Sequence, residues 1–234
     1  RISSQEALSR FGLTPITLRP KEGLALMNGT SMMTGIACLA FERARYLARV
    51  AASVTALAVE ALEANKAHYD ARLFAQKPHP GQVEVATWIR EAISYDAGTQ
   101  ALRRLQDPYS LRCAPHVIGV LVDALPWLRK TIETELNSSN DNPLIDGEEE
   151  LILHGGHFYG GHIAFAMDAL KTAVANVADL VDRQLALLMH QATNHGLPAN
   201  LSGAAPERLP INHGFKAVQI GASAWAAEAL KNTM

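Results

Sequence analysis

One helical pattern constrains the fold of this chain more than any other feature. It runs from about residue 162 to residue 193 without a break. At 1.5 Å per residue such a helix would be about 48 Å long. A compact globule of this length has a radius of gyration of only about 17 to 18 Å, so the helix must cross the whole molecule. We therefore predict an all-α fold built as a bundle of long helices. We also expect helices this long and apolar to pack against copies of the chain.

A second long helix is predicted over residues 31–64. Mostly apolar residues step by three and four along one side of it, at Ile36, Leu39, Arg43, Leu47, Val50, Val54, Leu57 and Ala61. Residues 50–59 are apolar on almost every side, which predicts that other helices enclose them. Shorter helices are expected over residues 4–11, 21–26, 80–93 and 117–136 and from residue 214. A short extended pair is expected within residues 151–158.

Composition excludes several kinds of partner. The net charge of the 234-residue chain is −2, and it has no basic stripe, so we expect no nucleic acid. The longest uncharged apolar stretch, residues 50–59, is shorter than the roughly 18 residues of a membrane span, so we expect no membrane partner. The two cysteines, Cys38 and Cys113, lack the spacing of a zinc site. They fit buried free thiols of a cytoplasmic protein.

Three polar side chains are spaced to act together. Gln106, Tyr109 and Arg112 follow one another at intervals of three residues, which would place them on one face of a helix. An arginine fork beside a phenol and an amide could bind a carboxylate through two hydrogen bonds. The alternative is a structural arginine that pairs with a carboxylate such as Asp107. The spacing alone favours neither.

Other polar residues stand out against the apolar helices. The run from Asn28 to Ser31 begins the helix over 31–64, where Thr30 or Ser31 would cap the first amides and leave the Asn28 amide free for a ligand. Residues 137–143 favour a helix terminator with side-chain turns over a direct catalytic part. Glu228 is a lone acid on an apolar surface, and such acids are usually paired and sometimes functional. The histidines at 154, 157 and 162 lack a metal-binding frame, so no metal is expected.

Taken together and in this order, six motifs resemble those of the aromatic amino acid ammonia-lyases and 2,3-aminomutases. They are Leu-Met-Asn-Gly-Thr (26–30), His-Pro-Gly-Gln (79–82), Gln-Asp-Pro-Tyr-Ser-Leu-Arg-Cys (106–113), Asn-Asp-Asn-Pro-Leu (140–144), His-Gly-Gly-His-Phe (154–158) and Gly-Leu-Pro-Ala-Asn-Leu-Ser-Gly (196–203). The resemblance covers essentially the whole chain. It implies the long-helix bundle that these enzymes share with fumarase and aspartase. Because residue 1 is an arginine and Met234 falls within a helical pattern, we expect residues 1–234 to be one central segment, truncated at both ends.

The resemblance also implies chemistry. The family removes ammonia from an aromatic amino acid, or shifts the amino group to the β-carbon, with a methylidene-imidazolone electrophile made from an internal Ala-Ser-Gly. It implies a homotetramer whose sites are built from three subunits. By analogy the catalytic residues would be Tyr109, Asn28 and Glu228, with Asn28 assisting and Glu228 facing the substrate amine. Substrate would be bound by Arg112, which takes the carboxylate, by Gln106, which lines the electrophile with Tyr109, and by Phe158, which packs the site.

The departures from the family pattern are equally informative. No Ala-Ser-Gly occurs in this sequence, and the upstream tyrosine loop and the downstream glutamine-rich motif are also missing. We therefore expect the segment alone to be inactive. His157 stands where the relatives usually carry asparagine.

The choice of substrate rests on two short segments. Residues 194–198 and 214–216 look more like the phenylalanine and tyrosine enzymes than the histidine enzymes, whereas nothing separates lyase from aminomutase. A second hypothesis is a catalytically dead helical scaffold for oligomerisation. In it, Gln106, Tyr109 and Arg112 would bind partners inside the protein and would not open onto a cavity. A fumarase-like lyase ranks last, because its Gly-Ser-Ser-x-Met-Pro loop is missing.

Overall fold

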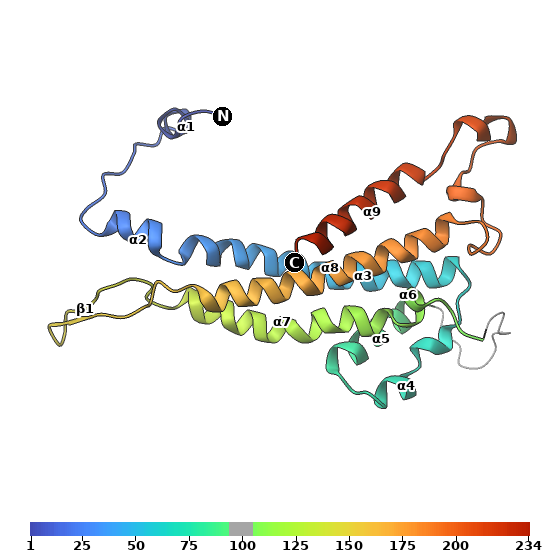
Figure 1. Cartoon of the computed structure of the whole chain (residues 1–234), viewed down its shortest axis with the longest axis horizontal. Coiled ribbons are helices and arrows are strands. Elements are labelled where there is room, and N and C mark those ends of the chain that lie inside the picture. The colour runs from blue at the N-terminus through green and yellow to red at the C-terminus, as the bar shows by residue number, and fades with distance from the viewer. Residues whose placement is uncertain (94–104) are drawn as a thin grey trace.

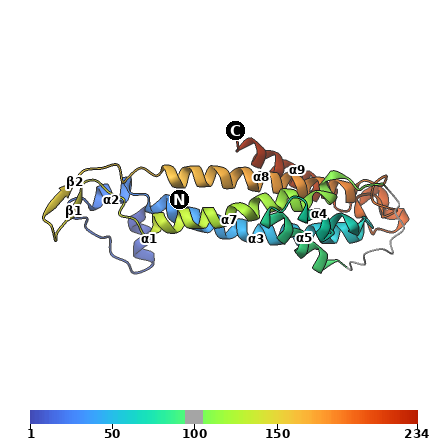
Figure 2. The ribbon, with the colours of Figure 1, turned by 90° about the horizontal axis from the view of Figure 1, so that it is seen from below.

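The computed structural model describes residues 1–93 and 105–234, which form an elongated bundle of long helices (Figure 1). The longest helices of this described part are α3 (Ser31–Ala61), α7 (Ala114–Leu136) and α8 (Gly161–Met189). They pack against one another along the bundle, as Figure 2 also shows. Helix α5 (Pro80–Ala92) packs on α7, and α9 (Lys216–Lys231) packs on α8. The predicted all-α, long-helix architecture is confirmed.

Short elements connect and flank these helices. At the amino end lie α1 (Ser4–Arg10) and α2 (Glu22–Asn28), neither of which has a buried residue. After α3 come a 3₁₀ turn η1 (Lys66–Tyr69), α4 (Ala71–Ala75) and the one-turn helix α6 (Tyr109–Arg112). After α8 come the 3₁₀ turns η2 (Ala199–Leu201) and η3 (Pro206–Ile211).

A small hairpin replaces the extended pair that was expected within residues 151–158. Strand β1 (Leu144–Asp146) pairs antiparallel with β2 (Leu151–Leu153), and Ile145 lies opposite Ile152. The expected range therefore holds only one of the two strands, since its partner precedes it in the sequence. The intervening turn is closed by Asp146, whose Oδ1 accepts the amide hydrogens of Glu148 and Glu149.

Alanines, and not the bulky apolar stripe, form the side of α3 that faces the rest of the chain. Small side chains let α3 approach α7 and α8 closely, because the distance between packed helices is set by the side chains at the contact. The stripe is only partly covered: Leu39 is 64% exposed and Leu57 is 70% exposed, whereas Leu47, Val50 and Val54 are half-buried. The prediction that other helices enclose residues 50–59 holds for most of this stretch, since only Ser53 and Leu57 within it are exposed. The buried alanines of α3 include Ala37, Ala44, Ala48, Ala51, Ala52, Ala56 and Ala58.

Within residues 1–93 and 105–234, two helical stretches are long and apolar enough to cross a membrane, by length and composition alone. They are Glu22–Ala61 and Tyr109–Leu136. The expectation that no stretch reaches this length is therefore wrong by this measure. Half of the most apolar part of the second stretch is buried among the helices of the bundle. The core helix of a bundle has the same composition as a membrane span. Length and composition therefore do not distinguish a membrane span from a core helix here.

Candidate functional site

Tyr109 and Arg112 lie on α6, a helix of a single turn that other elements hold in place. Such a short helix leaves its own carbonyl groups without partners. Two buried side chains supply them: the hydroxyl of Tyr69 donates to the Leu111 carbonyl at 2.7 Å, and Nε2 of Gln184 donates to the Ser110 carbonyl at 2.9 Å. Since Tyr69 follows α3 and Gln184 lies in α8, α6 is fixed from two sides.

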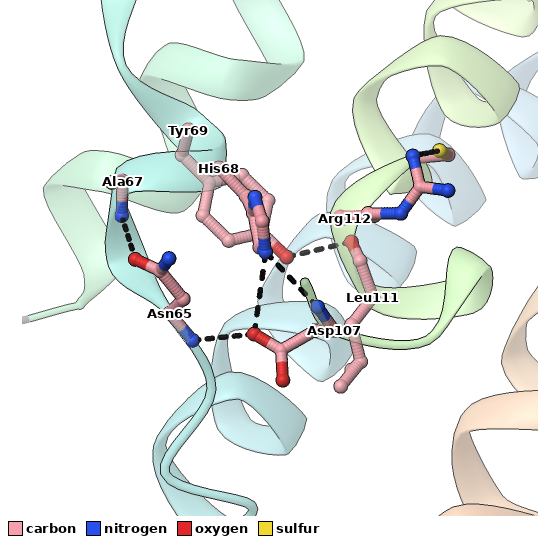
Figure 3. A network of polar contacts seen from close by, with 8 residues as sticks. Asn65, Ala67, His68, Tyr69, Asp107, Leu111 and Arg112 are labelled. Atoms are coloured by element: carbon pink, nitrogen blue, oxygen red, sulfur yellow. Dashed lines mark hydrogen bonds and ion pairs between the residues drawn. The ribbon is translucent and has the colours of Figure 1, made fainter. Parts of the chain in front are cut away.

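The residues before α6 are tied to η1 by a second set of polar contacts (Figure 3). The amide of Asn65 donates to Oδ2 of Asp107 at 2.6 Å, and the amide of Asp107 donates to Nε2 of His68 at 3.2 Å. Nε2 of His68 also lies 3.4 Å from Oδ2 of Asp107. Burial, followed by the charges of Asp107 and Cys113, raises the pKa of Tyr69 above its ordinary value. The Tyr69 hydroxyl therefore stays protonated and can donate.

Arg112 is half-buried and lacks an ionic partner among the described residues. Its Nε is buried without a hydrogen-bond acceptor, and Nη1 reaches only the sulfur of Cys113, at 3.4 Å. Burial raises the pKa of that thiol, with the nearby Arg112 charge acting in the opposite direction, and sulfur is a weak acceptor. The guanidinium lies 5.5 Å from the ring centre of Tyr109. A buried guanidinium nitrogen without an acceptor is unusual and fits a ligand site.

Two features of the predicted cluster need correction. Arg112 does not pair with Asp107, whose carboxylate contacts Asn65 and His68 instead. Gln106 does not share a helical face with Tyr109, because α6 begins only at Tyr109. The residue before a proline is biased towards extended backbone, so the helix cannot extend back through Pro108. Gln106 and Tyr109 are both exposed, and they lie near Arg112 only through the sequence.

A cleft of about 430 Å³ opens beside α6, between the end of α8 and the start of α9. Ser110 lines it together with Arg183, His190, Lys216 and Gln219. Arg183 also pairs with Asp179 at 3.2 Å, and Lys216 donates to Gln219 at 3.0 Å. Sequence reasoning missed Arg183, because it lies inside an apolar helix without a motif. Only the packing of α8 against α6 and α9 brings it to this cleft.

Asn28 lies at the opposite end of α3, as the last residue of α2. Its side chain is exposed and forms no hydrogen bond with another described residue, so its amide is free as expected. Thr30 does not cap α3 through its side chain, contrary to the prediction. Its backbone, with φ −82° and ψ 0°, lacks the extended geometry of a capping residue. Instead its Oγ1 accepts a hydrogen from Nδ2 of Asn140 at 2.6 Å.

Phe158 lies at the same end as Asn28, between β2 and α8. It is 49% exposed. Gly160, two residues further on, lies directly against the side chains of Met33 and Thr30. The loop that carries Phe158 is therefore packed against the start of α3.

The six predicted site residues do not converge within one chain. Asn28 precedes the first residue of α3, and α6 lies close to the end of that helix, which at 31 residues is about 46 Å long. Glu228 is exposed on α9 and belongs to neither end. Ser223, which precedes it by five residues, donates to Asp182 of α8 at 2.6 Å, so Glu228 lies alongside α8. One cluster holds Tyr109 and Arg112 with Gln106 nearby, and the other holds Asn28 and Phe158.

The histidines at 154, 157 and 162 form no metal centre in this part of the chain. Across residues 1–93 and 105–234, no three His, Cys, Asp or Glu side chains lie close enough to hold a metal ion. His157 instead lies against Gly155, where a Cβ would be 2.9 Å from its Nδ1. The paired glycines thus provide room for the histidine ring.

Known proteins resemble this chain over its whole length. The family model described as Aromatic amino acid lyase matches residues 1–234. Phenylalanine ammonia-lyase of Nostoc punctiforme is 39% identical over 224 residues, which are 92% of this chain and 39% of the relative. Histidine ammonia-lyase 2 of Fusobacterium nucleatum is 40% identical over 97% of this chain and 44% of the relative.

Solved structures agree with the sequence relatives. Phenylalanine ammonia-lyase of Rhodosporidium toruloides superposes with a TM-score of 0.83 at 33% identity, over 100% of this chain and 35% of that one. Phenylalanine aminomutase of Pantoea agglomerans gives 0.81 at 33% identity, over 100% and 48%. This chain spans less than half the length of each of these four relatives. The resemblance found in the six motifs is confirmed, and the chain belongs to the aromatic amino acid lyase family.

Proposed function

We propose that the full protein carrying this sequence eliminates ammonia from an aromatic L-amino acid, or moves its amino group to the β-carbon. One observation carries the proposal. Arg112 lies on a rigidly held turn with a buried, unpaired Nε and no carboxylate of its own among the described residues. The carboxylate of an amino acid would supply the missing acceptor, and a guanidinium fork binds a carboxylate through two parallel hydrogen bonds.

The remaining site residues would act around this anchor. Asn28 carries a free amide that can donate to the substrate, and Glu228 would face the substrate amine. Phe158 would pack against the aromatic ring. Preplaced donors that stabilise developing charge supply much of the rate in such sites. The side chains of Asn28, Glu228 and Phe158 are exposed, and none forms a hydrogen bond or ion pair with another described residue. They are therefore available for these roles.

The electrophile would come from outside this sequence, since Ala-Ser-Gly occurs nowhere in it. A methylidene-imidazolone, when present, supplies an electrophile for the amino acid. Tyr109 and Gln106 fit the border of such a group, because both are exposed beside Arg112 and neither is held in the core. These two side chains would orient the group and exclude water from it. Without it we expect residues 1–234 alone to be inactive.

The site would be assembled between copies of a homotetramer in the cytoplasm. Residues at opposite ends of α3 cannot bind one small amino acid within one chain, whereas neighbouring copies can bring the two ends together. The exposed apolar stripe of α3 supports association, because monomers rarely leave such large apolar surfaces open to water. The two free cysteines are consistent with a reducing compartment.

Phenylalanine or tyrosine is the favoured substrate over histidine. The proposal rests on residues 194–198 and 214–216, which resemble the phenylalanine and tyrosine enzymes. Residues 214–216 also lead into α9 at the cleft beside α6, where Lys216 is one of the lining residues. Relatives named for all three substrates, however, match at 39 to 40% identity, so overall similarity does not discriminate.

The test is a substrate survey with the purified full-length protein. Phenylalanine, tyrosine and histidine are offered separately, and the unsaturated acid is followed by ultraviolet absorbance and the β-amino acid by chromatography. An unsaturated acid identifies a lyase, and a β-amino acid identifies an aminomutase. If a folded oligomer forms neither product, the proposal is refuted in favour of the inert helical scaffold.

An Arg112→Ala variant tests the carboxylate contact itself. Hydrogen bonds to charged groups contribute about 1.5 to 3 kcal/mol, so kcat/KM should fall roughly 10- to 150-fold. The matched control is Arg129→Ala on the exposed side of α7, where the arginine pairs only with Glu133 among the described residues. Equal losses in both variants would contradict a specific role for Arg112.

A further inference from the structure

The segment that carries Asn28 is anchored on both sides to one short turn, residues 140–143. Before α2, the ammonium of Lys21 lies 2.9 Å from Oδ2 of Asp141 and donates to the Pro143 carbonyl at 2.7 Å. After α2, Oγ1 of Thr30 accepts from Asn140 at 2.6 Å. The two anchors join parts of the chain that are more than 100 residues apart in sequence.

Nothing else in the described part of the chain fixes this segment as firmly. Helix α2 has seven residues and none of them is buried, so packing against the core contributes little. The Asn28 side chain itself is exposed and without a hydrogen bond to another described residue. The position of its amide therefore depends on the two anchors.

Lys21 also adopts a strained backbone conformation. Its φ is 71°, in the left-handed region that residues other than glycine rarely enter. Such conformations persist where surrounding contacts over-determine them, and they are concentrated at functional sites. The ion pair and the carbonyl contact of the Lys21 ammonium are contacts of this kind.

Residues 140–143 are themselves fixed to the bundle. Nδ2 of Asn140 also donates to Oε1 of Glu135 in α7 at 2.9 Å, and Oδ1 of Asn142 accepts the amide hydrogen of Gly155 at 2.8 Å. Gly155 begins the loop that leads to Phe158. The same turn thus holds the segment with Asn28 and the loop with Phe158, at one end of the bundle (Figure 1).

We infer that Lys21 and Asn140 are positioning residues that set the place of the Asn28 amide relative to Phe158. This inference rests on the proposed function, since it gives Asn28 and Phe158 a common substrate. It goes further by assigning a role to Lys21, to Thr30 and to the polar turn at 140–143. From the sequence, residues 137–143 favour a helix terminator over a direct catalytic part.

The first experiment replaces Lys21 in the full-length enzyme. Lys21→Met keeps the length of the side chain and removes the ion pair with Asp141 and the hydrogen bond to the Pro143 carbonyl. We expect kcat to fall on the order of 10-fold with little change in KM, because a misplacement of about 1 Å can cost about 100-fold in rate. Lys21→Arg should restore most of the rate, since it can still reach Asp141. The control Arg129→Met, which breaks an exposed ion pair within α7, should leave kcat unchanged.

The second experiment removes the other anchor. Thr30→Val deletes the acceptor oxygen and leaves Asn140 bonded to Glu135. The double variant Lys21→Met/Thr30→Val should lose more activity than the product of the single losses, because either anchor alone still holds one side of α2. The control Thr134→Val removes an exposed hydroxyl that bonds only the Lys130 carbonyl among described residues.

Hydrogen exchange separates this inference from the proposed function. Amides 22–28 should exchange faster in Lys21→Met than in the wild type, whether or not the protein is active. Faster exchange together with the expected drop in kcat supports the inference. Unchanged exchange, or wild-type kcat in Lys21→Met, overturns it. Absence of any product from the wild type overturns the proposed function alone, and the exchange measurement still decides whether the anchors hold the segment.

Discussion

Tyr69 shows how a single hydroxyl can fix the geometry of a distant residue. It is 1% exposed, and its hydrogen bond to the Leu111 carbonyl holds the turn on which Arg112 lies. Its neighbours Asp107 and Cys113 reinforce the effect of burial by disfavouring the phenolate, so the pKa of Tyr69 is raised. The side chain therefore remains a donor under conditions in which an exposed tyrosine would begin to ionise.

Tyr69→Phe should destabilise the protein without changing its surface. The Leu111 carbonyl would lose its donor while buried, which costs about 1 to 3 kcal/mol. Urea unfolding of the full-length protein measures the change. Tyr46→Phe is the control, because Tyr46 is 70% exposed on α3 and should have almost no effect.

The same residue makes stability depend on pH in the alkaline range. Because its pKa is raised in the folded state, the protonated tyrosine contributes stability that is fully present below the unfolded pKa of about 10 and is lost at higher pH. Unfolding free energies measured across this range should therefore decline more steeply in the wild type than in Tyr69→Phe. Parallel curves for the two proteins would contradict the burial of an ionisable hydroxyl at this position.

At the scale of elements, α5 and α7 cross at a pair of glycines. A Cβ on Gly119 would lie 2.7 Å from the backbone nitrogen of Gln82, and one on Gly81 would lie 2.4 Å from the Gly119 carbonyl oxygen. Both neighbours are backbone atoms, which cannot move without shifting a helix. The α5–α7 contact therefore depends on the absence of side chains at these two positions.

Gly119→Ala should lower the stability of the bundle by about 1 to 3 kcal/mol, since overpacking forces backbone shifts. Gly35→Ala supplies an opposite control. Gly35 lies within α3, and a Cβ there would meet nothing within 4 Å. An alanine in such a helical position should stabilise by roughly 0.5 to 1 kcal/mol. Thermal melts of both variants measure the difference, and equal shifts would argue against close packing at Gly119.

The sequence predicted these elements better than it predicted their faces. Helix starts follow local signals such as Pro80 at the first position of α5, so their bounds agree with expectation to within a few residues. The stripe through Leu39 and Leu57 has the right periodicity, but these two leucines are themselves exposed. Periodicity identifies a face of a helix but does not say what covers that face. The side of α3 that packs closely on α7 and α8 is formed by alanines.

Long-range contacts explain what the sequence could not predict about the site. Tyr69 lies 42 residues from Leu111, and Lys21 lies 122 residues from Pro143. No local spacing connects such pairs, so motif reasoning found the side chains with free functional groups and missed those that hold them. It also placed Gln106 on a helix that begins only after Pro108. The functional roles assigned to Asn28, Arg112 and Glu228 remain predictions.

For the whole molecule, the exposed stripe of α3 predicts self-association. Burying a large aliphatic side chain contributes about 1.5 to 3 kcal/mol, so several of them on one helix give a substantial driving force. Leu39→Glu combined with Leu57→Glu should shift the full-length protein to smaller species in light scattering coupled to gel filtration. Lys130→Glu, a charge change on the exposed side of α7, should leave the mass unchanged. An unchanged mass for the leucine variant would place the interface elsewhere.

The length of α3 has a genetic consequence. If Asn28 and Arg112 of different copies serve one substrate, a defect at one end of the helix can be compensated by a partner that is intact at that end. Asn28→Ala and Arg112→Ala proteins, each impaired alone, should recover activity when expressed together. With random mixing of two chain types in a symmetric oligomer, about a quarter of the sites would receive both intact residues. Two damaged alleles could then complement each other in one cell, although neither encodes a fully active enzyme.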